Sequence, residues 1–396
     1  MIWDQYFGLD CMFDPEILDI IHNQVEVVDI LDVLCTDYSA SKLYNFFLPY
    51  VDKEFSDNER LIIAHHDTDY YPSYDSVGNT IYNLIQIITH LNISTDHIVI
   101  LTKNLGGRLE KEVVELCDAK NVTPIKVLEF SLDYAFPLSV TDLEVKKEKT
   151  FLFSFLNGLI RTHRLTMYGW LLEKNLCQYA SMSWHRNYIG LHYDVPFQSS
   201  DTIADLPEFR TTTPSSNRIN HDLEMNRQTK LMHIKHAKTF DVEVKSKNII
   251  GKTNSLETRW RAPFLQDSLV YLVTETVGPY PHVFLSEKTW KAMVSKTPFM
   301  IAGSKNSLAW LRDKGFKTFS HVWDEGYDNE SCFYRRAERI AETLADLKDQ
   351  DWNLVFQECL PVIEHNFNHL QTFKQEQEND LKNFLSLRYN NINMPK

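Results

Sequence analysis

Apolar positions along this chain form short runs that alternate with amphipathic stretches of helical period. Over the first third, runs typical of buried strands alternate with two stretches whose apolar residues recur at helical spacing. In chain order these segments are residues 61–64, 80–90, 97–101, 108–119 and 124–130. Because strand–helix–strand alternation produces parallel sheets with right-handed crossovers, we expect an α/β domain here.

The same alternation returns in the second half of the chain and ends in long helices. A strand over Phe151–Phe155 leads into a helix after Asn157-Gly158. Farther on, Ser286 opens a helix that Pro298 ends. The remaining expected segments are strands at 269–273, 299–302 and 316–319 and helices at 306–314, 330–347 and 352–387, the last of which Pro361 could break. The pattern predicts a second α/β domain followed by helices.

The length of 396 residues exceeds what one ordinary core holds, so we expect two domains. Residues 1–145 are expected to form an N-terminal Rossmann-like domain. Residues 150–335 are expected to form a C-terminal one, with a basic insertion at about 200–262. Residues 336–396 are expected to be helices that pack back on the N-terminal domain. The charged stretch 138–149 links the two halves.

Composition narrows the class of protein. The apolar content of 43% is globular, and no window approaches the roughly 18 uninterrupted apolar residues of a membrane-spanning helix. The N-terminal stretch is acidic and lacks the basic start of a secretion signal. The six cysteines are scattered without a C-x-x-C pair, which favours a reducing compartment over a zinc site or a disulfide framework. We therefore expect a cytoplasmic protein without a membrane span.

Two carboxylates and a lysine are expected at one edge of the second sheet. Glu275 follows a predicted strand, and Glu287 and Lys288 open the next helix. In α/β sheets, ligands bind beyond the carboxyl ends of strands and next to helix N-termini. A single carboxylate there is an ordinary helix cap. Two carboxylates with a lysine favour a ligand that carries both hydroxyls and phosphate, and simple capping is the alternative.

A second group of polar residues surrounds the strand that starts at Phe151. Ser154 and Asn157 lie on or just after this strand, and Arg161 and Arg164 lie in the helix that follows. Arginine binds phosphate in a bidentate manner, so this group could hold a diphosphate. Taken alone, the two arginines are equally explained as solvated helix residues.

These two segments together resemble the nucleotide-sugar-binding domain of fucosyltransferase-like GT-B glycosyltransferases. Glu275 matches the first glutamate of the family motif, and Ser286-Glu287-Lys288 matches its Thr/Ser-Glu-Lys element. Residues 298–303 match the strand and glycine that follow. Upstream, the strand, serine and asparagine and the arginine-bearing helix also match, with Ser154, Asn157 and Arg164 or Arg161 at the corresponding positions. The stretch 284–328 is also similar to uncharacterised phage-encoded glycosyltransferase-like proteins.

The resemblance implies a GT-B-like fold, in which two Rossmann-like domains face a cleft and C-terminal helices follow. It implies transfer of a sugar from a GDP- or UDP-linked donor to an acceptor hydroxyl, with inversion and without a metal or other cofactor. Glu275, Ser286 and Glu287 would then bind the donor together with Asn157 and Ser154, and the diphosphate would lie against Lys288 and Arg164 or Arg161. Val283-Phe284 replace the family's acidic residue and tyrosine, so the resemblance does not fix the sugar as fucose.

An inverting transferase needs a base that takes the proton of the acceptor hydroxyl. Asp67 and Asp69 follow the strand at 61–64, at a carboxyl end where such a group belongs, and are our candidates. His66, Tyr70 and Tyr71 are candidates for acceptor binding. Caps and turns, which aspartate often makes, are the alternative explanation of these residues.

The acceptor has two candidate classes. A glycan is the family default, and the phage likeness makes a hydroxymethylated base in DNA the alternative, in a bacterial or phage-infected cytoplasm. The net charge of −13 opposes a nucleic-acid partner, whereas residues 209–262 hold eleven Lys and Arg against five Asp and Glu. A solvated hairpin near 239–250 explains that basic segment as well. A non-catalytic nucleotide- or sugar-binding module is a third possibility.

Overall fold

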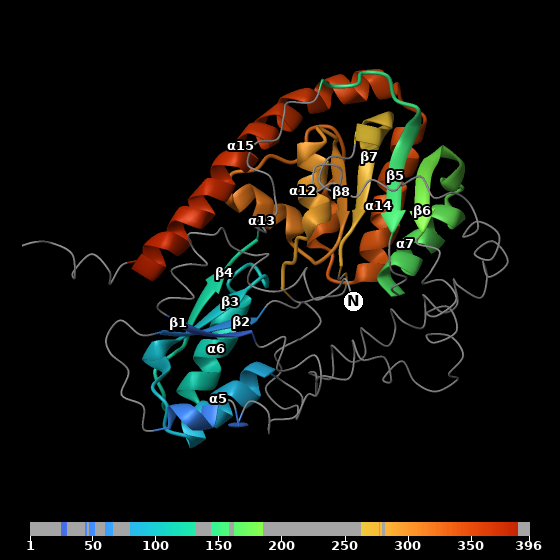
Figure 1. Cartoon of the computed structure of the whole chain (residues 1–396). Helices are drawn as coiled ribbons and strands as arrows, with labels where there is room; N and C mark the ends of the chain where they lie inside the picture. The colour runs from blue at the N-terminus through green and yellow to red at the C-terminus, as the bar shows by residue number, and fades with distance from the viewer. Residues whose placement is uncertain are drawn as a thin grey trace, which may run out of the picture. The chain divides into compact units, whose positions relative to one another are not determined.

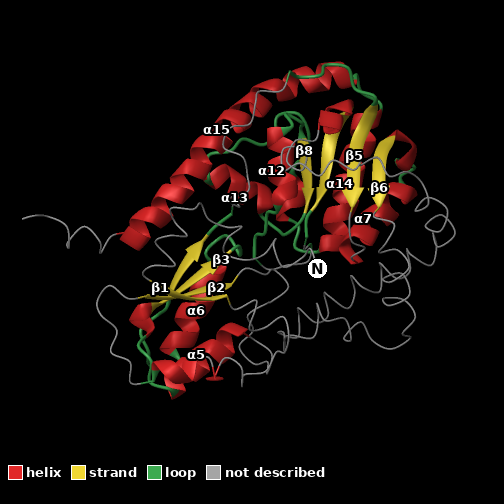
Figure 2. Cartoon of the chain, in the orientation of Figure 1, coloured by secondary structure: helices red, strands yellow, loops and turns green. Residues whose placement is uncertain are grey.

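The computed structural model describes residues 25–29, 44–45, 47–51, 60–65, 80–131, 144–157, 162–184, 263–276, 278 and 282–386. These residues form an α/β structure with two four-stranded sheets in which every strand pair is parallel (Figures 1 and 2). The chain divides into two compact units. Unit 1 contains the described residues up to Ser131 and those from Thr372 onward, and unit 2 contains those between Glu144 and Gln371.

The sheet of unit 1 has the sequential order β1-β2-β3-β4. Right-handed crossovers in a sequential parallel sheet place successive helices on the same face, and Figure 1 shows α5 and α6 together on one side. The elements of this unit are β1 (Val25–Asp29), η1 (Leu48–Tyr50), β2 (Arg60–His65), α5 (Thr80–His90), η2 (Thr95–His97), β3 (Ile98–Thr102), α6 (Arg108–Asp118) and β4 (Lys126–Glu129).

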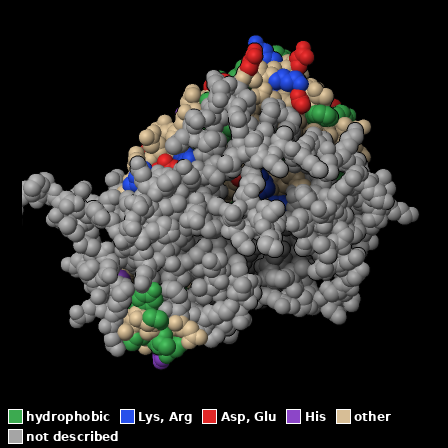
Figure 3. All heavy atoms as spheres, viewed as in Figure 1, with side chains coloured by type: hydrophobic (Ala, Val, Ile, Leu, Met, Phe, Trp, Pro, Cys, Tyr) green, Lys and Arg blue, Asp and Glu red, His purple; other side chains and the backbone are tan. Residues whose placement is uncertain are grey.

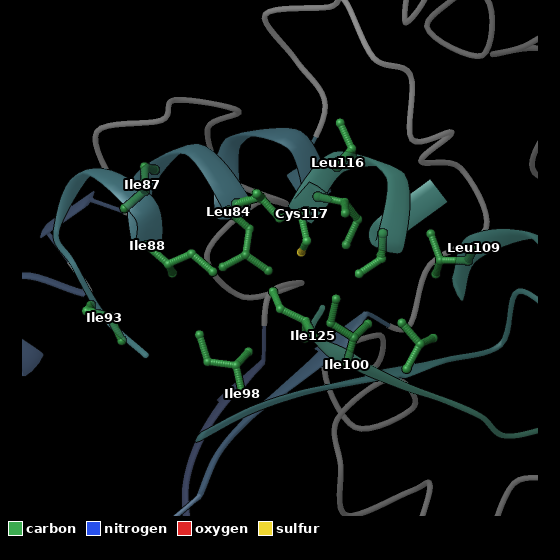
Figure 4. Close-up of a cluster of buried hydrophobic side chains, with 14 of the residues drawn as sticks. Leu84, Ile87, Ile88, Ile93, Ile98, Ile100, Leu109, Leu116, Cys117 and Ile125 are labelled. Carbon is green, nitrogen blue, oxygen red and sulfur yellow. The ribbon is translucent and has the colours of Figure 1, made fainter. Parts of the chain in front are cut away.

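The core of unit 1 lies between these two helices and the sheet. All five residues of β3 are buried. Leu84 and Ile88 from α5 and Leu109 from α6 pack toward Ile100 of β3 (Figure 4). The apolar periodicity of the two helices therefore produces their buried faces.

The turn before α6 depends on two glycines and a carboxylate. Gly106 and Gly107 have φ angles of 90° and 70°, which side-chain-bearing residues rarely adopt. Their amides donate to the carboxylate of Glu129, at the end of β4, at 3.0 and 2.5 Å. An anion from the protein itself thus occupies the turn that opens this helix.

The sheet of unit 2 has the order β6-β5-β7-β8. The chain passes from β5 outward to β6 and returns on the other side of β5 with β7, so the strand order reverses between β5 and β7. The elements are β5 (Phe151–Asn157), α7 (Thr162–Glu173), η3 (Cys177–Tyr179), β6 (Ala180–Trp184), η6 (Pro263–Asp267), β7 (Ser268–Thr274), α12 (Glu287–Val294), β8 (Phe299–Ala302), α13 (Ser307–Asp313), η7 (Gly326–Asn329) and α14 (Phe333–Lys348).

The segment before β5 is held by charged and polar contacts. Lys146 forms an ion pair with Asp267. Lys149 Nζ donates to the carbonyl of Gln266 at 2.9 Å and lies 3.6 Å from the ring centre of Phe356 on the last helix, α15 (Trp352–Ser386). Burial, together with the charge of Lys146, lowers the pKa of Lys149 to about 8.

In the space-filling view, acidic and basic side chains lie together at the top of the molecule (Figure 3).

The last helix, α15 (Trp352–Ser386), is shared between the units, because its residues from Thr372 onward belong to unit 1. Pro361 lies inside this helix and does not break it. Buried residues on both sides of the proline, including Phe356, Cys359 and Ile363, hold the two halves in place. None of the helices in the described ranges has the length and apolar content needed to cross a membrane.

The predicted elements agree with most of the structure, and two differences stand out. The strand expected at 316–319 is wrong, because Lys317 donates its amide to Asn366 and Phe319 donates its amide to Glu325, at 2.8 and 2.6 Å, instead of joining a sheet. Strands β1 and β6 were not predicted. The hairpin expected near 239–250 lies outside the described residues.

Replacement of Ile100 by alanine should lower the free energy of unfolding by about 2–5 kcal/mol, because the side chain is 0% exposed and its loss leaves a cavity. Denaturant-induced unfolding measures this change. Leu48, which is 48% exposed, is the matched control, and Leu48→Ala should change the free energy by no more than about 0.5 kcal/mol. Equal effects of the two substitutions would contradict the core described here.

Candidate functional site

The reversal of strand order between β5 and β7 defines the candidate site in unit 2. In open α/β sheets, such a switch point opens a crevice beyond the carboxyl ends of the two strands, and ligands bind there. Asn157 is the last residue of β5, and Glu275 directly follows β7. Both residues predicted to bind the donor at this edge are therefore adjacent to the switch point.

Asn157 offers an unused hydrogen-bond donor at this edge. Its Oδ1 accepts a 2.6 Å hydrogen bond from Thr274 Oγ1, which joins the ends of the two strands. Its Nδ2 has no partner in the described part of the chain, although the residue is only 4% exposed. An unpaired buried amide costs about 1–3 kcal/mol, which a ligand oxygen would recover.

Glu275 is fully buried, and its carboxylate accepts hydrogen bonds from other residues of the protein. Its Oε2 accepts hydrogen bonds from the amide, at 3.1 Å, and the hydroxyl of Ser286, and its Oε1 accepts from Thr289 Oγ1 at 2.6 Å. Burial raises the pKa of Glu275, while the charge of Lys288 and the two hydroxyl hydrogen bonds oppose that rise. The carboxylate thus caps α12, and both of its oxygens are engaged.

The main chain at Glu275 is fixed by the first turn of α7. His163 Nε2 lies 2.9 Å from the carbonyl oxygen of Glu275 and donates to it, since a carbonyl can only accept. Arg164 Nη2 donates to the same oxygen at 3.2 Å. Both side chains are buried, at 3% and 4% exposure. Arg164 therefore orients the end of β7, rather than presenting its guanidinium to solvent.

Gly303 makes room for the side chain of Glu275. A Cβ atom at position 303, just after β8, would lie 3.1 Å from Glu275 Cγ, closer than ordinary contacts allow. A side chain at position 303 would therefore need Glu275 to shift slightly. Gly278, in the loop after β7, is more tightly constrained, because a Cβ there would approach His163 and Phe333 to 2.7 Å.

Glu287 and Lys288 are the charged pair that remains accessible at the start of α12. The Glu287 side chain is 43% exposed and the Lys288 side chain 16%. Lys288 Nζ donates to Glu287 Oε1 at 2.9 Å and to Ser286 Oγ at 3.0 Å. Partial burial acts to raise the pKa of Glu287, but the charge of Lys288, its hydrogen bond and Lys291 outweigh it and lower the pKa to about 2. The carboxylate is therefore ionised at neutral pH.

Ser154, also predicted to bind the donor, lies away from this edge. Ser154 is 0% exposed in the middle of β5, and its hydroxyl is 2.7 Å from that of Ser268. Val283 and Phe284 are buried apolar residues. The predicted residues that lie outside the described part of the chain are Arg161, His66, Asp67, Asp69, Tyr70 and Tyr71; His65 is the last residue of β2.

The acidic turn after α13 is structural. Glu325 accepts hydrogen bonds from Thr318 and from the amide of Phe319, at 2.7 and 2.6 Å. Asp328 accepts the amides of Leu308 and Ala309 at 2.9 and 3.0 Å and so caps α13. Burial raises the pKa of both carboxyls, against these hydrogen bonds.

Sequence reasoning missed Thr274, Thr289 and the contact of Gly303 with Glu275. The spacing Ser286-x-x-Thr289 at a helix start was the available signal for the second hydroxyl on Glu275. Thr274 could have been found by pairing the ends of the two strands that flank the switch point. The missed residues bring no charge of their own.

The accessible chemistry consists of one amide donor, one carboxylate and one ammonium. An amide and an ammonium suit phosphate oxygens, and a carboxylate suits hydroxyls. Within the described ranges, no group of three or more His, Cys, Asp or Glu side chains is arranged to hold a metal ion. No family model matches this chain, and no curated protein is significantly similar to it.

Replacement of Glu275 by glutamine should change how stability depends on pH. A raised pKa in the folded state contributes stability that is full below the ordinary glutamate pKa, about 4.3, and is lost as pH rises through the raised value. The stability of the wild type should therefore fall as pH rises above the ordinary glutamate pKa, and Glu275→Gln should not show this fall. Urea unfolding at a series of pH values measures the difference.

Asp349→Asn is the matched control, because it removes one carboxylate that is 78% exposed. Its difference from the wild type should not follow the profile of Glu275→Gln. A difference between Glu275→Gln and the wild type that stays constant across this pH range would contradict the assignment.

Proposed function

We propose that this protein is a glycosyltransferase that binds a nucleotide-diphosphate sugar at the switch point of unit 2. The observation that carries the proposal is the unpaired, buried Nδ2 of Asn157 between β5 and β7, at the same edge as the accessible Glu287–Lys288 pair. A chain of hydrogen bonds through Thr274 and, one residue on, Glu275 connects these groups.

The groups match the parts of such a donor. Glu287, ionised at neutral pH, accepts hydrogen bonds from ribose or sugar hydroxyls. Lys288 and the Asn157 amide donate to the diphosphate. When the glycosidic bond to the diphosphate breaks, negative charge develops on the leaving phosphate, and preorganised donors stabilise that charge. Ser286 and Glu275 hold Lys288 and the start of α12 in place.

The proposed arrangement is GT-B-like, with the donor on unit 2 and the acceptor on unit 1. The acceptor hydroxyl is a sugar hydroxyl of a glycan. A carboxylate from the segment after β2, Asp67 or Asp69, takes the proton of that hydroxyl while the anomeric carbon is attacked, so the configuration inverts. The placement of this segment just beyond the end of β2 supports the assignment.

Nucleoside diphosphates should raise the unfolding temperature of the wild type, and Lys288→Ala should reduce that effect. A ligand that binds only the folded state adds about 2.7 kcal/mol of stability at a hundredfold excess over its Kd. The loss of a hydrogen bond between charged groups should weaken binding by about 1.5–3 kcal/mol. Thermal unfolding with GDP, UDP, ADP and CMP, with and without EDTA, and calorimetry with the best ligand measure both effects.

Lys317→Ala is the matched control, because this exposed lysine lies in another loop of unit 2. It should leave nucleotide affinity unchanged. If no nucleotide raises the unfolding temperature of the wild type, the proposed function is wrong. If a nucleotide binds but no donor sugar is ever transferred or hydrolysed, the protein is a binding module.

Asp67→Asn and Asp69→Asn should separate catalysis from binding. Loss of a general base typically lowers turnover by about a hundredfold to ten-thousandfold. One of the two variants should show such a loss in a sugar-transfer assay and keep the nucleotide affinity of the wild type in calorimetry. Full activity of both variants would place the base elsewhere.

A further inference from the structure

The first turn of α14 carries positive charge where helices usually carry negative charge. Cys332, the residue before the helix, makes no capping hydrogen bond through its side chain, and the first turn has no acidic residue. Arg335 and Arg336 lie there instead. Because the N-terminus of a helix is itself positive, two guanidinium groups there are unfavourable without a nearby anion.

Arg336 is buried beside this helix start. Its Nη1 donates to the carbonyl of Gly303 and its Nη2 to the carbonyl of Glu330, and the residue is 2% exposed. Since Glu330 precedes the helix, the guanidinium lies back toward the N-terminus of α14. Its Nε has no partner in the described ranges. Burial lowers the pKa of Arg336 to about 10, against the charges of Asp328 and Glu330, so the group stays positive at neutral pH.

A second buried donor without a partner adjoins this guanidinium in the chain. Ser304 follows Gly303, whose carbonyl Arg336 holds, and is 1% exposed. Its Oγ makes no hydrogen bond to any part of the chain that the structure describes. Two unpaired buried donors at one strand end point to a ligand that brings acceptor oxygens.

Cations outnumber carboxylates around this helix start. Lys305 Nζ donates to Ser331 Oγ at 3.0 Å, and neither Lys305 nor Arg335 has an ion-pair partner among the described residues. Glu330 accepts the amide of Cys332 at 3.1 Å and lies 3.9 Å from Arg339, and the charge of Asp328 also acts on Arg336. Glu275 and Asp328 accept amides at the starts of α12 and α13. At the start of α14, the two carboxylates of Glu330 and Asp328 face four cations, namely Lys305, Arg335, Arg336 and Arg339.

This helix start adjoins the switch point. Gly303 contacts both sides, because Arg336 holds its carbonyl and the Glu275 side chain packs against its Cα. The ring of Phe333, the first residue of α14, lies 5.6 Å from that of His163, which holds the Glu275 carbonyl. A ligand that reaches from Asn157 along the ends of β7 and β8 would meet the start of α14.

We propose that the start of α14 binds a phosphate group, with Ser304 Oγ and the Arg336 guanidinium as buried donors and Arg335 as the outer cation. The phosphate belongs to the diphosphate of the nucleotide-sugar donor, and in this respect the proposal rests on the proposed function. Backbone amides at a helix start and a guanidinium are a combination that suits phosphate oxygens.

The test compares phosphate ligands with and without a nucleoside. Calorimetry with inorganic pyrophosphate, GDP, UDP and the free nucleosides should be run on the wild type, Arg335→Gln and Ser304→Ala. Pyrophosphate and the preferred nucleoside diphosphate should each bind about tenfold or more weakly to Arg335→Gln, because a charged hydrogen bond is lost. Ser304→Ala should weaken both by up to about tenfold, as for a neutral hydroxyl.

Two controls make the outcomes decisive. Arg108→Gln removes a half-exposed arginine of unit 1 and should bind all ligands as the wild type does. Arg335→Gln alters an exposed side chain, so its folding is not at risk. Free nucleosides should bind the wild type, Arg335→Gln and Ser304→Ala with equal affinity.

Each outcome assigns the failure to one proposal. If Lys288→Ala weakens the binding of a nucleoside diphosphate while Arg335→Gln and Ser304→Ala do not, the inference is wrong and the proposed function stands. A second outcome is that pyrophosphate binds, that both variants lower its affinity, and that no nucleoside diphosphate binds more tightly than pyrophosphate. The phosphate site is then supported and the nucleotide-sugar function is wrong. If pyrophosphate does not bind the wild type at all, the inference is overturned.

Discussion

The buried carboxylate of Glu275 is the interaction on which the candidate site depends. It receives three hydrogen bonds from Ser286 and Thr289, and its main-chain carbonyl receives two from α7. A side chain at Gly303 would crowd the Glu275 side chain. Burying a carboxyl group is costly unless it is hydrogen-bonded, so these neighbours stabilise the buried side chain of Glu275. These contacts fix the start of α12 and so determine where the accessible Glu287 and Lys288 lie.

The protein uses its own carboxylates in the same manner elsewhere. Glu129 accepts the two glycine amides before α6, and Asp328 accepts two amides of α13. Each places negative charge at the positive end of a helix, which stabilises the helix and occupies its anion-binding position. Carboxylates near predicted helix starts in this sequence are therefore structural in several cases. A ligand is indicated only where donors remain unpaired, as at Asn157.

Apolar periodicity predicted most elements to within one or two residues at each end. The helix Thr80–His90 and the strand Phe299–Ala302 have the bounds expected from the sequence. The strand expected at 316–319 has the apolar residues of a strand, but its amides bond to side chains 6 and 49 residues away, and no local pattern records such partners. The α/β class depends on local apolar patterns and could be predicted, whereas these amide contacts depend on residues distant in the sequence and could not.

The sequence predicted those site residues that lie at the ends of neighbouring strands. It did not predict the contacts that depend on the direction in which a side chain points. Asn157 and Glu275 follow from the rule that polar residues at the ends of neighbouring parallel strands converge. The engagement of Arg164 with a carbonyl 111 residues away is invisible in the sequence, because a solvated arginine and a buried one have the same local pattern. Ser154 was misleading for a related reason, since its hydroxyl finds a partner on the adjacent strand.

The hydrogen bond between Asn157 and Thr274 has a consequence for the order of folding. The contacts of Glu275 with Ser286 and Thr289 span only 11 and 14 residues, whereas Asn157 and Thr274 are 117 residues apart. Closing the longer loop costs roughly 2 kcal/mol more in chain entropy, because each doubling of length adds about 0.6 kcal/mol. The unit from β7 to β8 can thus form from local contacts before β5 joins it. We therefore expect the amide of Asn157 to reach its place after the local hydrogen bonds of Glu275 have formed.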